Sequence, residues 1–177
     1  MGELVGKIIR RYSYPVFVVD DASTDDTHFK AKQAGAVVIP LCVNLGAWGA
    51  TQTGLRYALR QGYKVIVTID ADGQHDPQDI AQVVEPILKG RADVSIGSCP
   101  QRGSRGRHLA WRLLRTVSGL VQQDLTSGFR AYGRKPIHTL ACWQATFLEF
   151  LDVGVLSLLI SLGARVAVVS GRMSPLC

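Results

Sequence analysis

The sequence has few cysteines, and their spacing excludes two common kinds of cross-link. The four cysteines lie far apart, with no C-x-x-C pair and no histidine at metal-binding spacing. A disulfide framework and a zinc site of Cys and His ligands are therefore not expected. We predict that the cysteines are reduced thiols.

The sequence also lacks a long apolar run and a secretory signal. The stretch "VGVLSLLISLGA" (153–164) is the longest uncharged one near the C-terminus, and it is shorter than the roughly 20 residues of a membrane-spanning helix. We expect it to form a core helix. The opening "MGELVGKIIRR" is amphipathic and does not have the pattern of a signal peptide, so a cytoplasmic location is predicted.

Acidic residues are missing from one segment that is rich in arginine. Between Val94 and Gln123 there are five arginines and no Asp or Glu, so this segment is expected to attract anions. Within it, residues 101–119 combine arginines with Trp111 and an apolar stripe, which is typical of a helix at an anionic membrane surface. A solvated helix covering the sheet has the same pattern. A nucleic-acid partner is not expected, because no nucleic-acid-binding motif is present.

The sequence does contain short β-branched runs that alternate with helical patterns. Strands are expected near 15–19, 36–39, 65–69, 92–97 and 165–169, and helices near the N-terminus, at 48–59, from Asp76 to Gly90, at 107–122 and near 151–163. This alternation predicts one α/β domain over residues 1–177, with a mostly parallel sheet between two layers of helices.

Carboxylates follow two of the expected strands. Asp20 and Asp21 end one strand, and Asp70 and Asp72 end another. Ligands of α/β sheets bind beyond the carboxyl ends of the strands, so we expect all four acids to face one crevice. Crowded carboxylates need a counter-ion. With Gln74 they supply only oxygen ligands, which suits Mg²⁺ or Mn²⁺.

Four segments together resemble a known family. The sequences "VFVVDDASTDDT", "NLGAWGATQTGLRYAL", "VTIDADGQHDPQDI" and "DLTSGFRAYGRKPI" are similar in order and spacing to the family 2 glycosyltransferases with the Rossmann-like GT-A fold. The nearest similarity is to the dolichyl- or polyprenyl-phosphate mannosyl- and glucosyltransferases. It extends from about Leu4 to about Val169.

The resemblance implies a reaction and a set of site residues. Such an enzyme transfers a sugar, with inversion, from GDP-mannose or UDP-glucose to a polyprenyl or dolichyl phosphate, and it works at the cytoplasmic face of a membrane. The implied donor-binding residues are Val19, Asp21, Asp70, Ala71, Asp72 and Gln74. Asp72 and Gln74 are the implied metal ligands, and Asp124, Arg130 and Arg134 are the implied catalytic residues.

The chain departs from the family pattern at its start. Family members begin with a central strand, whereas "MGELVGKIIRR" resembles the helix that follows it. We therefore expect an N-terminally truncated domain with two exposed strand edges and a reduced base pocket.

Two alternatives remain open at this point. In a phospho-acceptor receiver module, Asp20, Asp21 and Asp70 would form the acidic pocket, with Lys135 as the basic group. An inactive, truncated relative of the glycosyltransferases would bind no nucleotide.

Overall fold

The computed structural model describes residues 1–73, 75–98, 127–147 and 153–170. The helices are α1 (Gly2–Tyr12), α2 (Thr27–Gln33), α3 (Gly46–Arg60), α4 (Ile80–Leu88), α6 (Arg134–Ala141) and α7 (Val153–Ser161), with 3₁₀ turns η1 (Pro77–Asp79) and η2 (Trp143–Phe147). The strands are β1 (Phe17–Asp20), β2 (Val37–Pro40), β3 (Ile66–Thr68), β4 (Val94–Ser98), β5 (Arg130–Tyr132) and β6 (Val166–Ser170). These elements confirm the predicted α/β class.

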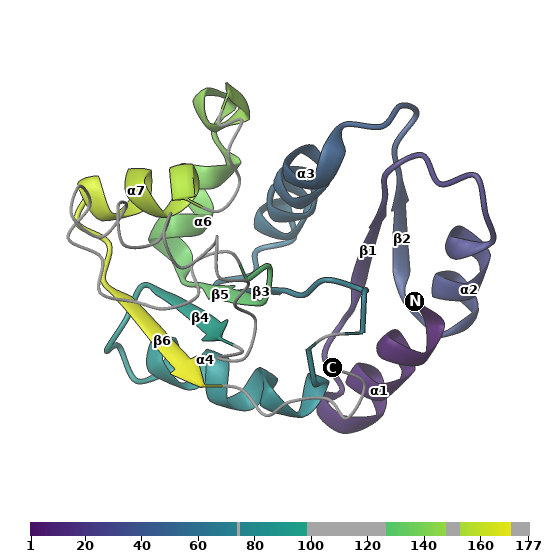
Figure 1. The fold of residues 1–177 in the computed structure, drawn as a ribbon, viewed down its shortest axis with the longest axis horizontal. Coiled ribbons are helices and arrows are strands. Elements are labelled where there is room, and N and C mark those ends of the chain that lie inside the picture. Colours follow the sequence, from purple (N-terminus) through teal and green to yellow (C-terminus); the bar gives the residue numbers. More distant parts are fainter. Residues whose placement is uncertain (74, 99–126, 148–152, 171–177) are drawn as a thin grey trace, which may run out of the picture.

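The described strands form two separate sheets. β1 pairs with β2 in parallel, and the second sheet has the order β3-β5-β4-β6 (Figure 1). β5 runs antiparallel to both β3 and β4, whereas β4 and β6 are parallel. The second sheet is thus mixed rather than mostly parallel. Among the described strands, β1 and β3 do not pair with each other, so each has one edge without a described partner.

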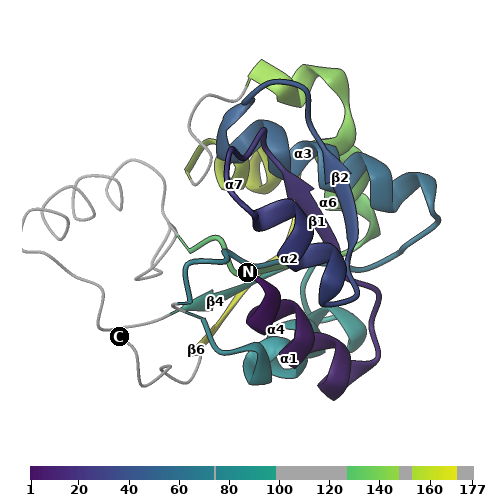
Figure 2. The same ribbon diagram turned by 90° about the vertical axis from the view of Figure 1, so that its right-hand side faces the viewer.

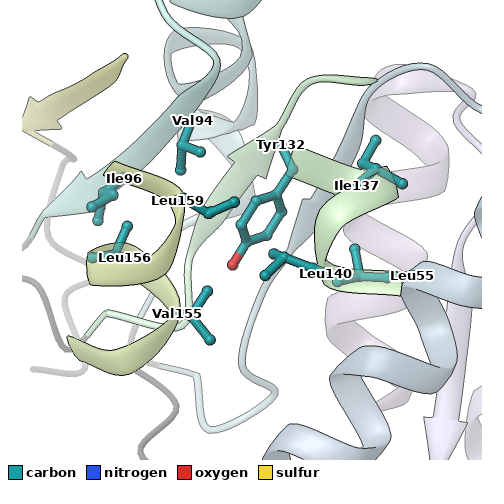
Figure 3. Packing of buried hydrophobic residues seen from close by; sticks show 9 residues of the cluster. All are labelled: Leu55, Val94, Ile96, Tyr132, Ile137, Leu140, Val155, Leu156 and Leu159. Carbon is teal, nitrogen blue, oxygen red and sulfur yellow. The ribbon is translucent and has the colours of Figure 1, made fainter. Parts of the chain in front are cut away.

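Helices cover both faces of the sheets, as the three-layer prediction required. Helices α3, α6 and α7 lie on one side, and α1 and α4 lie on the other (Figure 1). Figure 3 shows Tyr132 of β5 among side chains of α3, α6 and α7. The expected core helix near the C-terminus is confirmed, because Val155, Leu156 and Leu159 of α7 are almost completely buried.

The ends of the helical segment from Asp76 to Gly90 can be followed in detail. Asp76 caps η1 by accepting a hydrogen bond from the Gln78 N–H at 2.9 Å, and Pro77 occupies the first turn. Pro86 lies inside α4, which ends two residues later at Leu88. The helix thus continues past Pro86 and ends just before Gly90, whose φ of 65° suits a glycine at the end of a helix.

A buried amide joins α3 to the segment that contains α6 and η2. The Gln52 Nε2 donates to the carbonyl oxygens of Leu140 at 2.9 Å and Cys142 at 3.1 Å, and its Oε1 accepts from the Thr146 hydroxyl at 3.0 Å. Trp48 on the same helix donates its Nε1–H to the Ala145 carbonyl at 2.7 Å. The buried polar atoms of Gln52 are therefore satisfied, and they fix α3 against α6.

Candidate active site

A cavity of about 660 Å³ lies between β1 and β3. We call it the interstrand cavity. Residues 16–19 form one wall of the cavity, and residues 65–69 form the opposite wall. Residues from α3 line one of the two remaining sides, and residues from α1 and α4 line the other. Figure 1 shows β1 and β3 on either side of this region, with α3 beside both strands. Most of the lining is apolar, but Asp70, Ala71, Gly128 and Arg130 gather where β3 ends.

Asp70 lies directly against the backbone of Gly128. A Cβ atom at position 128 would come within 2.5 Å of the Asp70 carboxyl carbon and would overlap its oxygens. Thr68, two residues before Asp70, also contacts this segment, because its hydroxyl donates to the Gly128 carbonyl at 2.9 Å. Glycine is therefore required at position 128 for the carboxylate to take this position.

Arg130 supplies a buried positive charge at the same end of β3. It is the first residue of β5, where it pairs with Thr68 of β3, and only 2% of its surface is exposed. Its Nε donates to the Ser127 carbonyl at 2.8 Å. Because the residue also lines the cavity, a fixed guanidinium stands beside the carboxyl end of β3, where it can bind phosphate oxygens.

The loop after β3 carries an exposed carboxylate and a buried histidine. Asp72 is exposed, and the following Gly73 has a φ of 80°, which glycine adopts without strain. His75 is 7% exposed, and its Nε2 lies 3.4 Å from the Ser127 hydroxyl. The burial of His75 against Ser127 and Phe129, just before β5, is a feature that spacing in the sequence did not indicate.

Asp20 serves the turn after β1 rather than a shared acidic crevice. It is 6% exposed, and its Oδ1 accepts a hydrogen bond from the Ser23 N–H at 3.0 Å, while His28 Nδ1 lies 3.3 Å from Oδ2. Hydrogen bonding to Ser23, and to a smaller extent to His28, holds the pKa of Asp20 below its ordinary value of 3.8, although burial acts in the opposite direction. The prediction that all four acids face one crevice was wrong for this residue.

Asp21 holds the start of α3. Its Oδ1 accepts a hydrogen bond from the Leu45 N–H at 2.6 Å, and its carbonyl accepts one from Asn44 at 3.3 Å. The side chain therefore joins the end of β1 to the loop before α3. Asp21 is half-buried, and it is not among the residues that line the cavity, whereas Val19 is.

Arg134 and Lys135 lie at the opposite end of the sheet from Asp70. β5 is antiparallel to β3, so Arg130 pairs with Thr68 near the acids, whereas Tyr132 pairs with Ile66 at the start of β3. The chain then leads away into α6, where both basic residues are exposed. The structure does not bring Arg134 to the cavity. It also separates Lys135 from Asp70, which removes the basic group of the receiver interpretation.

Several predicted residues fall outside the described ranges. These are Gln74, Asp124 and the arginine-rich segment 101–119. Within the described part of the chain, no group of three His, Cys, Asp or Glu side chains is arranged to hold a metal ion. Over the same residues, no helix has both the length and the apolar character to cross a membrane.

The environment of Asp20 leads to a prediction about stability and pH. Replacing Asp20 with Asn should lower the free energy of unfolding at pH 7 by about 1–2 kcal/mol, because hydrogen bonds to a buried charged group are lost. The pKa of Asp20 is lower in the folded protein than its ordinary value of 3.8, so the ionised carboxylate stabilises the folded state above that pH. This contribution is lost as the pH falls through the folded-state pKa of Asp20. The deficit of the variant should therefore shrink toward pH 3.

Urea unfolding at several pH values checks this prediction. Asp26→Asn is the matched control, because Asp26 is exposed and makes only a surface ion pair with Lys30. It should change stability little at either pH. A deficit for Asp20→Asn that stays constant from pH 7 to pH 3 would contradict the assignment.

Comparison with known protein families identifies the fold and the family. The model of the family described as "Glycosyl transferase family 2" matches residues 3–150. Polyprenol monophosphomannose synthase of Mycolicibacterium smegmatis is 31% identical over 71% of this chain and 53% of its own length. A UDP-N-acetylglucosamine–dolichyl-phosphate N-acetylglucosaminyltransferase of Methanococcus voltae is 30% identical over 71% of this chain and 61% of its own length. The chain thus spans little more than half the length of these relatives.

A solved structure supports the same conclusion about the fold. Glucosyl-3-phosphoglycerate synthase from Mycobacterium tuberculosis, determined in complex with Mn²⁺ and UDP-glucose, is 25% identical. The similarity covers 99% of this chain and 68% of that one, with a TM-score of 0.67. Because the family model covers most of the chain, and Asp70, Gly128 and Arg130 come together at the end of β3, the sequence resemblance is confirmed. The chain belongs to glycosyl transferase family 2.

Proposed function

We propose that this chain is the donor-binding part of an enzyme that transfers a sugar from a nucleotide-diphosphate donor to a polyprenyl phosphate. The relatives whose names specify polyprenol or dolichyl phosphate support the acceptor class. One observation carries the proposal. Three segments that are far apart in the sequence place Val19, Asp70 and Arg130 around one cavity.

Each residue is assigned a role that its position allows. Val19, near the end of β1, contacts the nucleoside of the donor. Asp21, which directly follows β1, is assigned to the same contact. Asp70 and Ala71, which line the cavity where β3 ends, lie against its ribose, since a carboxylate accepts hydrogen bonds from hydroxyl groups. The Arg130 guanidinium binds the diphosphate. Arg134 has no role in this proposal, because it lies at the other end of β5.

A divalent cation, Mg²⁺ or Mn²⁺, would be held by Asp72 together with Gln74. Asp72 fits this role because it offers a carboxylate on an exposed loop immediately after the cavity. Such ions prefer oxygen ligands and share their coordination with phosphates and water, so one or two protein ligands are sufficient. When bound, the ion would neutralise charge on the diphosphate.

The reaction would exchange one bond at the anomeric carbon for another. An oxygen of the acceptor phosphate forms a bond to this carbon, and the bond to the nucleoside diphosphate breaks, with the electron pair leaving on the diphosphate. Arg130 stabilises the charge that develops there. The acceptor phosphate is already ionised near pH 7, so little general-base assistance is needed. Asp124 is the candidate where a base is used.

The acceptor would place this reaction at a membrane surface. We assign residues 101–119, the segment rich in arginine with Trp111, to contact with the anionic surface. Its positive charges would attract both acidic headgroups and the phosphate of the acceptor.

Nucleotide binding tests the proposal directly. Trp48 lines the interstrand cavity, so its fluorescence should respond to a bound base. We expect GDP or UDP to quench the fluorescence in the presence of Mn²⁺ and to quench it less without the ion. If neither nucleotide, nor GDP-mannose or UDP-glucose, binds with Mn²⁺ present, the chain is an inactive relative and the proposal is wrong.

Asp72→Ala should remove the part of the nucleotide affinity that depends on Mn²⁺. We expect a loss of about tenfold with the ion present, which corresponds to ~1.4 kcal/mol, and little change without it. The fold should be unaffected, because Asp72 is exposed. Asp25→Ala, which removes another exposed carboxylate, is the control and should bind as the parent does. An equal loss of nucleotide affinity with and without Mn²⁺ would contradict the assignment of Asp72 to the metal site.

A further inference from the structure

A buried histidine joins the loop after β3 to the segment before β5. Residues 70–73 of this loop are exposed, whereas His75 is buried. The His75 Nε2 lies 3.4 Å from the hydroxyl oxygen of Ser127, which is itself only 1% exposed. The imidazole ring also packs against Phe129, with 5.2 Å between the ring centroids. Figures 1 and 2 show the stretch of chain between β3 and α4 that carries this histidine.

Ser127 in turn holds the residues that follow it. Its hydroxyl oxygen accepts a hydrogen bond from the Phe129 N–H at 3.2 Å, and its carbonyl accepts one from the Arg130 Nε at 2.8 Å. A hydroxyl group that accepts one hydrogen bond can still make another, so Ser127 is able to bond with His75 and with the Phe129 backbone together. Arg130 lines the interstrand cavity. A chain of contacts therefore runs from His75 through Ser127 to the cavity.

The exposed loop that carries Asp72 is attached to the segment before β5 at both of its ends. Just before the loop, the Thr68 hydroxyl donates to the Gly128 carbonyl at 2.9 Å. Just after it, His75 contacts the residue that precedes Gly128. Both contacts thus reach the same short segment, which leads directly to Arg130. The position of the Asp72 carboxylate relative to this arginine depends on both of them.

Packing alone does not explain a histidine at this position. A buried imidazole is costly unless its ring nitrogens find hydrogen-bond partners. Leucine or phenylalanine would fill space beside Phe129 without this requirement. The Ser127 hydroxyl supplies a partner at Nε2. The nitrogen of His75, rather than its volume, is therefore the feature that connects the two segments.

We propose that His75 is a positioning residue for the diphosphate site. It holds the loop of Asp72 against the segment of Arg130, so that a cation at Asp72 and the guanidinium act on the same diphosphate. His75 does not itself line the interstrand cavity. Removing a residue that orients a metal ligand typically lowers metal affinity by about 10- to 100-fold. This role rests on the proposed function, because that function assigns the cation to Asp72 and the diphosphate to Arg130.

Two replacements of His75 separate its nitrogen from its volume. His75→Leu keeps an apolar contact with Phe129 but has no hydrogen-bonding atom, whereas the amide of His75→Gln can take the place of Nε2. We expect His75→Leu to lower the affinity for UDP or GDP by about tenfold in the presence of Mn²⁺. The affinity without Mn²⁺, and the affinity for uridine or guanosine, should change little. His75→Gln should recover most of the loss. Isothermal titration with and without Mn²⁺ measures these differences.

Hydrogen exchange gives a second measurement that needs neither metal nor nucleotide. The Phe129 amide donates to the Ser127 hydroxyl, so its exchange should be faster by about five- to tenfold in His75→Leu and close to that of the parent in His75→Gln. Ser127→Ala removes the hydroxyl without changing the histidine, and it should show the same Mn²⁺-dependent loss of nucleotide affinity. Ser95→Ala is the matched control, because the Ser95 hydroxyl is also buried but has no hydrogen-bond partner among the described residues.

Failure of this role can be distinguished from failure of the proposed function. If the parent binds nucleotide with Mn²⁺ and His75→Leu and Ser127→Ala bind it equally well, the positioning role is wrong and the proposed function stands. Equal losses with and without Mn²⁺, and no recovery in His75→Gln, would assign the histidine to general stability of the fold. If the parent binds no nucleotide, both the function and the positioning role are wrong. Ser127→Ala keeps the test decisive where His75→Leu does not fold.

Discussion

Replacing Gly128 with alanine should lower the affinity for a nucleotide diphosphate by about 10- to 100-fold, because hydrogen bonds to a charged group such as the Asp70 carboxylate contribute ~1.5–3 kcal/mol. The new methyl group would occupy the place of the Asp70 carboxylate. Asp70 is exposed, so its side chain can rotate away at little cost. We therefore expect the free energy of unfolding to change by less than about 1 kcal/mol, as for most surface substitutions.

Gly97→Ala is the matched control for this prediction. At position 97 the added Cβ would overlap the ring of Phe129, with Cε1 at 3.0 Å, and this ring is only 1% exposed. The ring has no solvent to move into, so we expect destabilisation of about 1–3 kcal/mol. Chemical unfolding and nucleotide titration should thus separate the two variants. A stable Gly128→Ala variant that binds nucleotide normally would show that the position of Asp70 is unimportant for binding.

Arg130→Ala should reduce the affinity for UDP or GDP by about 30- to 100-fold, which corresponds to ~2–3 kcal/mol for charge-assisted hydrogen bonds to phosphate. Binding of the free nucleoside, uridine or guanosine, should change little, because the guanidinium is assigned to the diphosphate. Arg130→Lys keeps the charge but not the planar pair of donors, so an intermediate affinity is expected. Isothermal titration with each nucleotide and nucleoside measures these differences.

Arg134→Ala provides the comparison within the same chain. This arginine lies four positions along the sequence but at the opposite end of β5, and we expect its removal to leave nucleotide affinity unchanged. Equal losses for UDP and uridine in Arg130→Ala would indicate a general loss of structure. Thermal unfolding of each variant shows whether this has happened.

The β-branched runs of the sequence were sufficient to predict most of the strands and their acidic ends. "PVFVV", "AVVI" and "RVAVV" each correspond to a strand within one or two residues. β5 was not predicted as a strand, because it has only three residues and no alternating pattern. Arg130 was identified solely by the similarity of "TSGFR" to a family motif. Its burial beside Thr68 depends on an antiparallel pairing that spacing along the chain does not reveal.

The two neighbouring acids at the end of β1 show a further limit of sequence reasoning. Asp20 and Asp21 have the same side chain, yet one accepts a hydrogen bond from Ser23 and the other from Leu45. The outcome depends on the path of the chain after the strand, where Ala22 adopts a φ of 59°. A turn of this kind is set by local hydrogen bonds rather than by hydrophobic periodicity. The short helices α2 and α6 were missed for a related reason, since neither has a long apolar stripe.

The Gln52 amide has a consequence for how the molecule opens. Both carbonyls that it binds belong to the segment around α6, so α3 cannot separate from this segment without breaking three hydrogen bonds of Gln52 at once. Local unfolding of these elements should therefore be cooperative, with amide protons of α3 and α6 exchanging at one common free energy. Whatever occupies the space beside α3 would slow exchange in α6 as well, at a distance from the point of binding.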